Sequence, residues 1–308
     1  VRRWQHECDY HVRNSCIRET GEDQAGPIGQ TTRQPALKAC LILVLAILFV
    51  GEVRADDIRL EGKFVQGGLV QGTVPAGAKV TFEGRPVRVS AKGRFLIGFS
   101  RDAGPTSSLA MRMPDGQQIN KPLKIKKRKY QIQRIDGLPR KMVTPPKAVY
   151  DRIRAENATI SKARAKDTAD DHFESGWIWP AQGRISGVYG SQRVLNGKPR
   201  RPHFGVDVAA PVGTPVVSPA DAIVALAHRD MYYTGGTLIL DHGHGLTSAL
   251  LHMDTVEVQV GDFVRKGQRI GTIGKTGRAT GPHLDWRINL FKARLDPAFL
   301  VPPMPASK

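Results

Sequence analysis

Short runs of alternating apolar and polar residues, separated by turn-forming Gly, Pro and Asp, fill most of residues 58–135. They include GKFVQGG, AKVTFEG, RPVRVSAKGRFLIGF and SLAMRMPDG. A period of two places the apolar side chains on one face of a strand, and each cluster of turn residues ends a strand. The pattern predicts a small all-β domain of sandwich type over residues 56–140.

Two further patterns follow along the chain. The segment 141–175 contains PPKAVYDRIRAENATISKARAKDTADDHF, which is Ala-rich, charged and free of Gly, and it predicts a solvated linker helix after the two prolines. Strand signals then return over residues 176–302, as in HFGVDVAAP, GTLILDHGHG, LTSALLHMD and HLDWRINLF. These runs predict a second, larger all-β domain, followed by a short tail at 303–308. The predicted fold class is therefore all-β.

One apolar run has the pattern of an export signal. Lys38 precedes the apolar residues 39–50, and a site of small residues follows at 53–55. The run is short for a membrane span, but its basic, apolar and cleavage regions come in the order of a secretory signal peptide. We expect residues 1–55 to be a preamble and signal peptide, and the exported chain to begin near Asp56. The alternative is an uncleaved anchor in the inner membrane.

Composition changes this picture in two ways. All three cysteines, Cys8, Cys16 and Cys40, lie before residue 56, so the exported part has no thiol and any metal must be held by His and carboxylate side chains. The net charge is +18, and residues 56–308 carry 39 Lys and Arg against 22 Asp and Glu. Such a surface favours an anionic cell wall or membrane as partner.

A nucleic-acid partner is not expected, although the run KPLKIKKRKYQIQRI is strongly basic. Its apolar residues Leu123 and Ile125 alternate with Lys124 and Lys126. The alternation predicts an edge strand with a basic, solvated face, since edge strands commonly carry lysines that discourage pairing with other chains.

Histidine is concentrated in the second domain, where six of the nine fall between His203 and His283. His203 and Asp207 are four residues apart, which is about 13 Å in a straight strand and too far to share an ion. Gly205 allows the chain to bend so that the two side chains converge. His252 ends the apolar run ALL. Alone, the first pair also fits a surface loop, and His252 also fits a ring capped by a backbone carbonyl.

The run HLDWRINLF holds a further pair. His283 and Asp285 are two apart in a predicted strand, so they share the face that Leu284 and Trp286 do not occupy. A histidine and a carboxylate about 6 to 7 Å apart can act on one small ligand. The alternative is that both are solvated. His242 and His244, in the Gly-rich stretch DHGHG, are expected to be exposed in a turn.

Taken in order, these motifs resemble a known family. HxxxD followed by AAPxGTPV, an apolar strand ending in His, and GxxGxxTGPHL together resemble the lysostaphin-type zinc metallopeptidases, the LytM-domain peptidoglycan endopeptidases, over about residues 183–299. The resemblance implies an antiparallel sheet of barrel-sandwich-hybrid type with a groove that holds one zinc ion. It implies His203, Asp207 and Asp285 as metal ligands, and His252 and His283 as catalytic histidines.

Asp285 departs from the family, which usually has His at this position. A carboxylate oxygen binds zinc at a similar distance, so the replacement need not abolish the site. Two carboxylates and a neutral imidazole would cancel the charge of a dication, so we expect a weaker Lewis acid and better competition by manganese.

The function implied by the resemblance is hydrolysis of peptide bonds in peptidoglycan stem peptides or cross-bridges, in the periplasm or cell envelope. The alternative is a non-catalytic LytM-like module that binds the wall and activates a separate amidase. A regulatory protein that opens the groove is a further expected type of partner. Replacement of one ligand by another metal-binding residue favours the enzyme.

Overall fold

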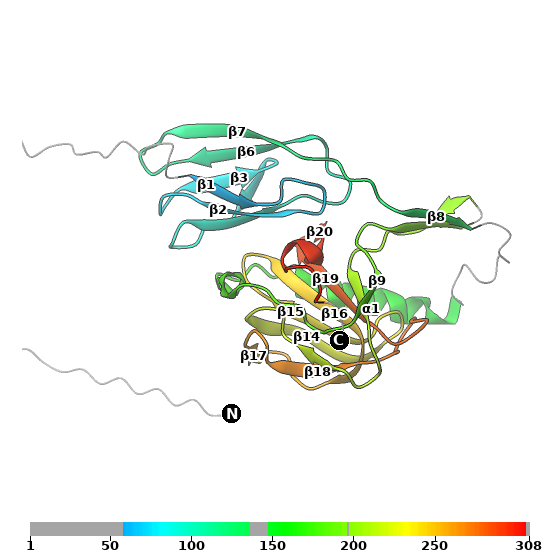
Figure 1. The fold of residues 1–308 in the computed structure, drawn as a ribbon. Helices are drawn as coiled ribbons and strands as arrows, with labels where there is room; N and C mark the ends of the chain where they lie inside the picture. The colour runs from blue at the N-terminus through cyan, green and yellow to red at the C-terminus, as the bar shows by residue number, and fades with distance from the viewer. Residues whose placement is uncertain (1–57, 136–146, 196, 306–308) are drawn as a thin grey trace, which may run out of the picture. The chain divides into compact units, whose positions relative to one another are not determined.

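A computed structural model describes residues 58–135, 147–195 and 197–305 of the chain (Figure 1). The predicted signal peptide, its apolar run at 39–50, the three cysteines and the predicted start near Asp56 lie outside the described residues. Within the described residues, no helix combines the length and apolar character needed to cross a membrane.

The first domain is a sandwich of two antiparallel sheets. Its strands are β1 (Arg59–Gly62), β2 (Leu69–Thr73), β3 (Lys79–Phe82), β4 (Arg85–Val87), β5 (Arg94–Gly98), β6 (Thr106–Arg112) and β7 (Gln118–Lys124). One sheet has the order β1-β2-β5 and the other the order β4-β3-β6-β7. Phe95 and Ile97 of the first sheet share an apolar core with Leu109 and Met111 of the second. Because alternate positions face inward, these short strands bury one face each.

The basic run at the end of this domain behaves as its alternation predicts. Strand β7 is an edge strand of its sheet. Leu123 and Ile125 are buried, whereas Lys124 and Lys126 are exposed. The basic residues therefore form a solvated face.

In its described part, the segment between the domains contains the α-helix α1 (Tyr150–Arg164), preceded by a 3₁₀ turn at Lys147–Val149 and followed by another at His172–Ser175. A small sheet lies in the connections, with the order β11-β10-β8. Its strands are β8 (Ile132–Ile135), β10 (Gln192–Leu195) and β11 (Lys198–Pro199).

The second domain is built on a large antiparallel sheet whose main path is β17-β14-β15-β16-β19-β12-β9, with β13, β18 and β20 attached (Figure 1). Its strands are β9 (Arg184–Gly187), β12 (Val206–Ala209), β13 (Pro215–Val217), β14 (Ala222–Met231), β15 (Gly235–Asp241), β16 (Leu246–Val256), β17 (Phe263–Val264), β18 (Arg269–Ile273), β19 (Leu284–Leu290) and β20 (Ala293–Leu295). A last 3₁₀ turn spans Pro297–Phe299.

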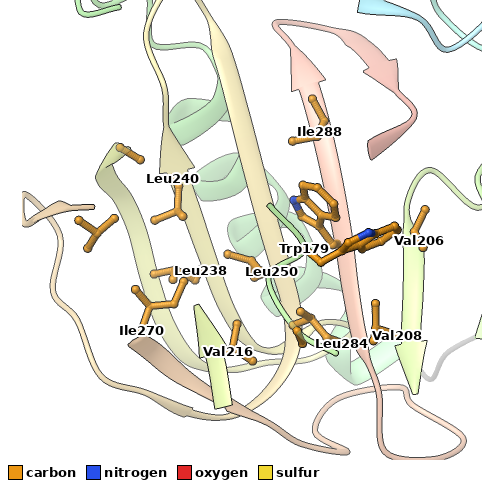
Figure 2. Packing of buried hydrophobic residues seen from close by; sticks show 14 of the residues in the cluster. Trp179, Val206, Val208, Val216, Leu238, Leu240, Leu250, Ile270, Leu284 and Ile288 are labelled. Carbon is orange, nitrogen blue, oxygen red and sulfur yellow. The ribbon is translucent and has the colours of Figure 1, made fainter. Parts of the chain in front are cut away.

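One face of this sheet carries the main core. Leu250 of β16 and Leu284, Trp286 and Ile288 of β19 are buried there, and Trp179 packs edge-on against Trp286 with ring centroids 5.6 Å apart. Figure 2 shows labelled members of this cluster gathered on one side of the strands. The alternating apolar residues of HLDWRINLF, namely Leu284, Trp286, Ile288 and Leu290, are thus all buried, as the pattern predicts.

The opposite face of the sheet is covered in part by α1. Ile160 and Ala163 of the helix join Ile239, Ala249 and Leu251 in a smaller apolar cluster. In Figure 2 the helix lies behind the strands, on the side away from the labelled core residues. We call this side of β15, β16 and β19 the α1 face. The prediction of a mostly β fold with a helical linker and an antiparallel C-terminal sheet is confirmed.

Candidate metal centre

Two carboxylates lie directly opposite each other on neighbouring strands of the α1 face. Asp207 of β12 pairs with Asp285 of β19, and Asp285 also pairs with Leu251 of β16. Like charges in such a cross-strand pair are destabilising unless a cation lies between or beside them. The register itself therefore points to a site for positive charge.

His203 reaches the same place from the segment before β12. Its backbone N–H donates to the carbonyl of Ser191, and its carbonyl accepts from the N–H of Gly190, both at 2.8 Å. These bonds fix the turn that brings His203 Nε2 to 3.2 Å from Asp207 Oδ1. The sequence prediction that the two side chains converge agrees with this geometry.

The three predicted ligands form one compact group. One ligand atom from each of His203, Asp207 and Asp285 lies within 4.8 Å of the others. His203 Nε2 and Asp207 Oδ1 are both buried and lack a hydrogen-bond partner. Burying polar atoms without partners is costly, and metal coordination would satisfy both of them. Burial lowers the pKa of His203, but its close contact with Asp207 and the charges of both carboxylates raise the pKa overall, so the centre attracts positive charge.

Two glycines leave the space that the carboxylates occupy. A Cβ at Gly205 would lie 2.3 Å from Asp285 Oδ1, and one at Gly187 would lie 2.1 Å from Asp207 Oδ2. Real side chains do not tolerate such contacts, so only glycine fits at either position. Glycine is required at position 205 because the Asp285 carboxylate approaches its Cα closely. The backbone of Gly205 is not in the left-handed region, since its φ is not positive.

Arg287 is a member of the site that sequence reasoning missed. Its Nε donates to Asp285 Oδ1 and Oδ2 at 3.0 and 3.1 Å, and its Nη2 donates to Oδ2 at 2.5 Å. Burial opposes ionisation of Asp285, but the charge and hydrogen bonds of Arg287 outweigh it and lower the pKa of the carboxyl. The available signal was the period of two, which places residues 283, 285 and 287 on one face.

Arg287 changes the charge of the centre. The carboxylates of Asp207 and Asp285 and the guanidinium of Arg287 together carry −1, so a dication with neutral imidazoles would leave +1. Our expectation of a weaker Lewis acid counted the two carboxylates alone and took no account of Arg287. With the ion pair, this centre has the same net charge as a site that holds a dication with one carboxylate.

The two predicted catalytic histidines are neighbours, with ring centroids 4.8 Å apart. His252 Nδ1 lies 2.9 Å from the carbonyl oxygen of Thr276, and His283 Nδ1 lies 2.8 Å from that of Gly281. A carbonyl only accepts, so each Nδ1 carries a proton and each neutral ring presents an unprotonated Nε2. His283 Nε2 is 4.0 Å from Asp207 Oδ1. Both rings can therefore accept a proton beside the carboxylates.

His252 is held in an uncommon backbone conformation. Its φ is 65°, in the left-handed region that side chains other than glycine rarely adopt. The N–H of His252 donates to the carbonyl of Thr234 at 2.9 Å, which helps to stabilise this conformation. Such strain is typical of functional positions, where it aims a side chain.

The centre keeps limited access to solvent. The side chains of His203, Asp207 and His283 are 20%, 22% and 16% exposed, whereas that of Asp285 is 4% exposed. A small molecule or a peptide segment can therefore reach the histidines, while Asp285 is held from within the protein.

The prediction that His242 and His244 are exposed is wrong, because both side chains are buried. His242 Nδ1 donates to the carbonyl of Asp221 and its Nε2 accepts from Ser248 Oγ, both at 2.7 Å. His244 packs against Phe173 with ring centroids 5.1 Å apart. The segment after α1 covers this turn, and the local sequence of the turn carries no sign of that cover.

Comparison with known proteins gives the class of the domain. Residues 201–297 match the family described as Peptidase family M23. Peptidoglycan DD-endopeptidase ShyA of Vibrio cholerae serotype O1 is 39% identical over 108 residues, which are 33% of this chain and 25% of that protein. Cell division protein DipM of Caulobacter vibrioides is 29% identical over 169 residues, 52% of this chain and 26% of that protein.

A solved structure extends the similarity beyond the matched segment. The crystal structure of a candidate M23 peptidase from Pseudomonas aeruginosa superposes with a TM-score of 0.60 at 28% identity, covering 77% of this chain and 95% of that one. The similarity of residues 201–297 to Peptidase family M23 agrees with the resemblance of the motifs in the second domain, and the fold of the Pseudomonas aeruginosa structure agrees with it as well. The chain spans about a quarter of the length of the two curated relatives.

Proposed function

We propose that this protein is a metal-dependent endopeptidase that hydrolyses peptide bonds in peptidoglycan. The observation that carries the proposal is the pairing of Asp207 and Asp285 across two strands, with His203 Nε2 beside them. The M23 domain and the similarity to a protein named peptidoglycan DD-endopeptidase support the substrate class. We further propose that the protein is exported to the periplasm or cell envelope, because that is where this substrate lies.

The donor set fits zinc. One imidazole nitrogen and two carboxylate oxygens are ligands that zinc accepts, and a set of three protein ligands is typical of catalytic sites. A bound zinc ion would supply a Lewis acid that polarises the scissile carbonyl and promotes ionisation of the attacking water. Manganese remains the predicted competitor, because two of the three ligands are carboxylates.

His252 and His283 handle protons in this proposal. Each ring offers an unprotonated Nε2, since its Nδ1 is committed to a backbone carbonyl, and His283 Nε2 lies 4.0 Å from Asp207 Oδ1. One ring accepts the proton of the attacking water as general base. The other, when protonated, donates a hydrogen bond to the oxygen that gains negative charge. The carbonyls of Thr276 and Gly281 hold the two rings in the orientation that both roles require.

A non-catalytic module that activates an amidase is the second candidate. The observation that favours it is the position of α1, which packs on the same face as Asp285 through Ile160 and Ala163. A long substrate would have to bind beside this helix or displace it. The intact set of ligands and the two oriented histidines favour the enzyme.

Histidine variants test the proposed roles. Purified peptidoglycan is incubated with zinc and the wild-type chain, His252→Ala, His283→Ala or a control, and soluble fragments are identified by mass spectrometry. His228→Ala is the matched control, because His228 is an exposed histidine of β14 in the same domain. We expect release to fall at least a hundredfold in the first two variants and to be unchanged in the control. Release within a few-fold of wild type in either variant would contradict its assigned role.

A further inference from the structure

Four arginines gather beside the metal centre although they come from four different parts of the chain. Arg164 ends α1, Arg201 precedes β12, Arg287 lies on β19 and Arg294 lies on β20. The guanidinium carbons of Arg201 and Arg294 lie 5.9 and 5.7 Å from the ring centroid of Phe204, which follows the metal ligand His203 in the chain. The fold thus concentrates positive charge next to the predicted ligands.

The arginines affect one another through their charges. Burial, and then the charges of Arg287 and Arg201, lower the pKa of Arg164 to about 10. Burial, followed by the charges of the other three, lowers the pKa of Arg294 to about 9. Clustered cations with this little compensation are unusual, because each one opposes the charging of its neighbours.

Carboxylates compensate the cluster only in part. In the described ranges, Arg287 forms an ion pair with Asp285, but no carboxylate lies within ion-pair distance of Arg164, Arg201 or Arg294. Asp207 is the other carboxylate whose charge acts on Arg287. Four guanidinium groups against two carboxylates leave +2, and a bound dication would raise the charge to +4. An anionic ligand would relieve this excess.

Buried hydrogen-bond donors that lack a partner lie at the arginine cluster. Thr247 and Asn289 are cross-strand neighbours on the α1 face and are both 0% exposed. Asn289 Oδ1 accepts from Arg294 Nη1 at 2.9 Å, so the amide of Asn289 lies at the cluster. Asn289 Nδ2, Thr247 Oγ1 and Arg164 Nε are all buried without a hydrogen-bond partner. All three can donate, and a ligand rich in acceptor oxygens would satisfy them.

We infer that the arginine cluster is a subsite for a carboxylate of the substrate peptide. This inference rests on the proposed function, because stem peptides carry free carboxylates along their length. The planar guanidinium group binds a carboxylate through two parallel hydrogen bonds, which gives orientation as well as affinity. The subsite would hold the peptide in register while its scissile bond lies at the metal centre, next to Asp285.

The sheet sets the distance between the metal centre and the arginine cluster. Residues 285, 287 and 289 of β19 follow one another on one face, at steps of about 6 to 7 Å. The cluster therefore extends from about 7 to about 14 Å beyond Asp285 along the strand. An extended peptide advances about 3.3 Å per residue, so the recognised carboxylate lies about two to four residues from the scissile bond.

The test uses a labelled synthetic stem pentapeptide with free carboxylates and a second peptide in which these are carboxamides. Binding to the full chain is measured by fluorescence anisotropy with chelator present, so that no cleavage occurs. The variants are Arg201→Gln and Arg294→Gln. Arg229→Gln is the matched control, because Arg229 is an exposed arginine of β14. Arg201 is also exposed, so its replacement should not affect folding.

We expect wild type to bind the acidic peptide at least tenfold more tightly than the amide, and each cluster variant to reduce this preference at least threefold. The control should retain it. Equal binding of the two peptides by wild type, no binding of either, or full preference in both cluster variants would overturn the inference. Hydrolysis with zinc is measured separately. Its absence alongside a retained preference would refute the proposed function and not the subsite, and the converse result would refute the subsite alone.

Discussion

Replacing Arg287 with Met tests whether the Asp285–Arg287 pair stands in for part of the charge of a metal. The variant keeps an apolar stem of similar length but removes every donor to Asp285. The carboxylate would then be 4% exposed, directly opposite Asp207 and without its three contacts from Arg287. Removing one partner of a buried ion pair costs about 3–5 kcal/mol, because a buried charge is left uncompensated.

The expected loss of stability in Arg287→Met depends on whether zinc is bound. In chelator, the free energy of unfolding should fall by about 3–5 kcal/mol, which is about 6–20 °C in Tm for a domain of 150–250 residues. With saturating zinc, the metal supplies the missing positive charge, so the loss should fall below about 2 kcal/mol. By linkage, this difference of at least about 1 kcal/mol means that the variant should bind zinc at least about fivefold more tightly than wild type.

Thermal unfolding followed by near-ultraviolet circular dichroism measures both quantities, because the Trp179–Trp286 pair lies in the core of this domain. Arg269→Met is the control. Arg269 also forms a two-bond pair, with Glu257, but the side chains are 55% and 36% exposed, so its loss should cost less than about 1 kcal/mol. An equal loss for Arg287→Met with and without zinc would refute the reasoning.

Three further predictions concern residues around the same centre and the adjacent turn. Gly205→Ala should weaken zinc binding at least tenfold in a competition assay, because the added Cβ displaces Asp285. Gly281→Ala is the control and should not weaken it, because a Cβ there meets no described atom within 4 Å. Equal zinc affinities of the two variants would contradict the account. Asp285→His should bind zinc less tightly than wild type because it leaves Arg287 unpaired beside the metal, and Asp285→His/Arg287→Met should recover affinity; tight binding by the single variant would be the contrary result. Burial lowers the folded-state pKa of His242 to about 4, so between about pH 6.5 and pH 4 the unfolded chain binds a proton that the folded chain does not, and the free energy of unfolding should fall by about 3 kcal/mol over this range. Urea unfolding across the range should show a shallower dependence of that free energy on pH for His242→Gln than for wild type. An unchanged dependence would argue against this role of His242.

The sequence predicts local pattern in this protein better than long-range register. Alternation in HLDWRINLF places Trp286 in the core and Asp285 on the other face, as the structure has them. The direct opposition of Asp207 and Asp285 does not follow from either run alone. It depends on how β12 pairs with β19, and β12 also has a shift of register against β9 after Asp207.

The features that the sequence did not predict share one physical cause: segments distant in the sequence cover the residues concerned. Most of α1 is exposed, as the sparse apolar residues of the linker predict, but Ile160 and Ala163 also dock it on the α1 face, which the sequence did not predict. His242 is buried beside Trp177, with ring centroids 4.7 Å apart, although a Gly-rich turn normally lies at the surface. Arg287 was within reach of sequence reasoning, because it continues the face of His283 and Asp285 by one step.

Zinc-dependent release of peptide fragments from peptidoglycan tests the central claim most directly. The chain is stripped of metal with chelator, dialysed, and returned to purified peptidoglycan with increasing zinc, and the fragments are read by mass spectrometry. The account predicts no release without metal and full release at one zinc per chain, with products cut at a peptide bond. Release that is indifferent to chelator, or none at any zinc concentration from a folded protein, would contradict it.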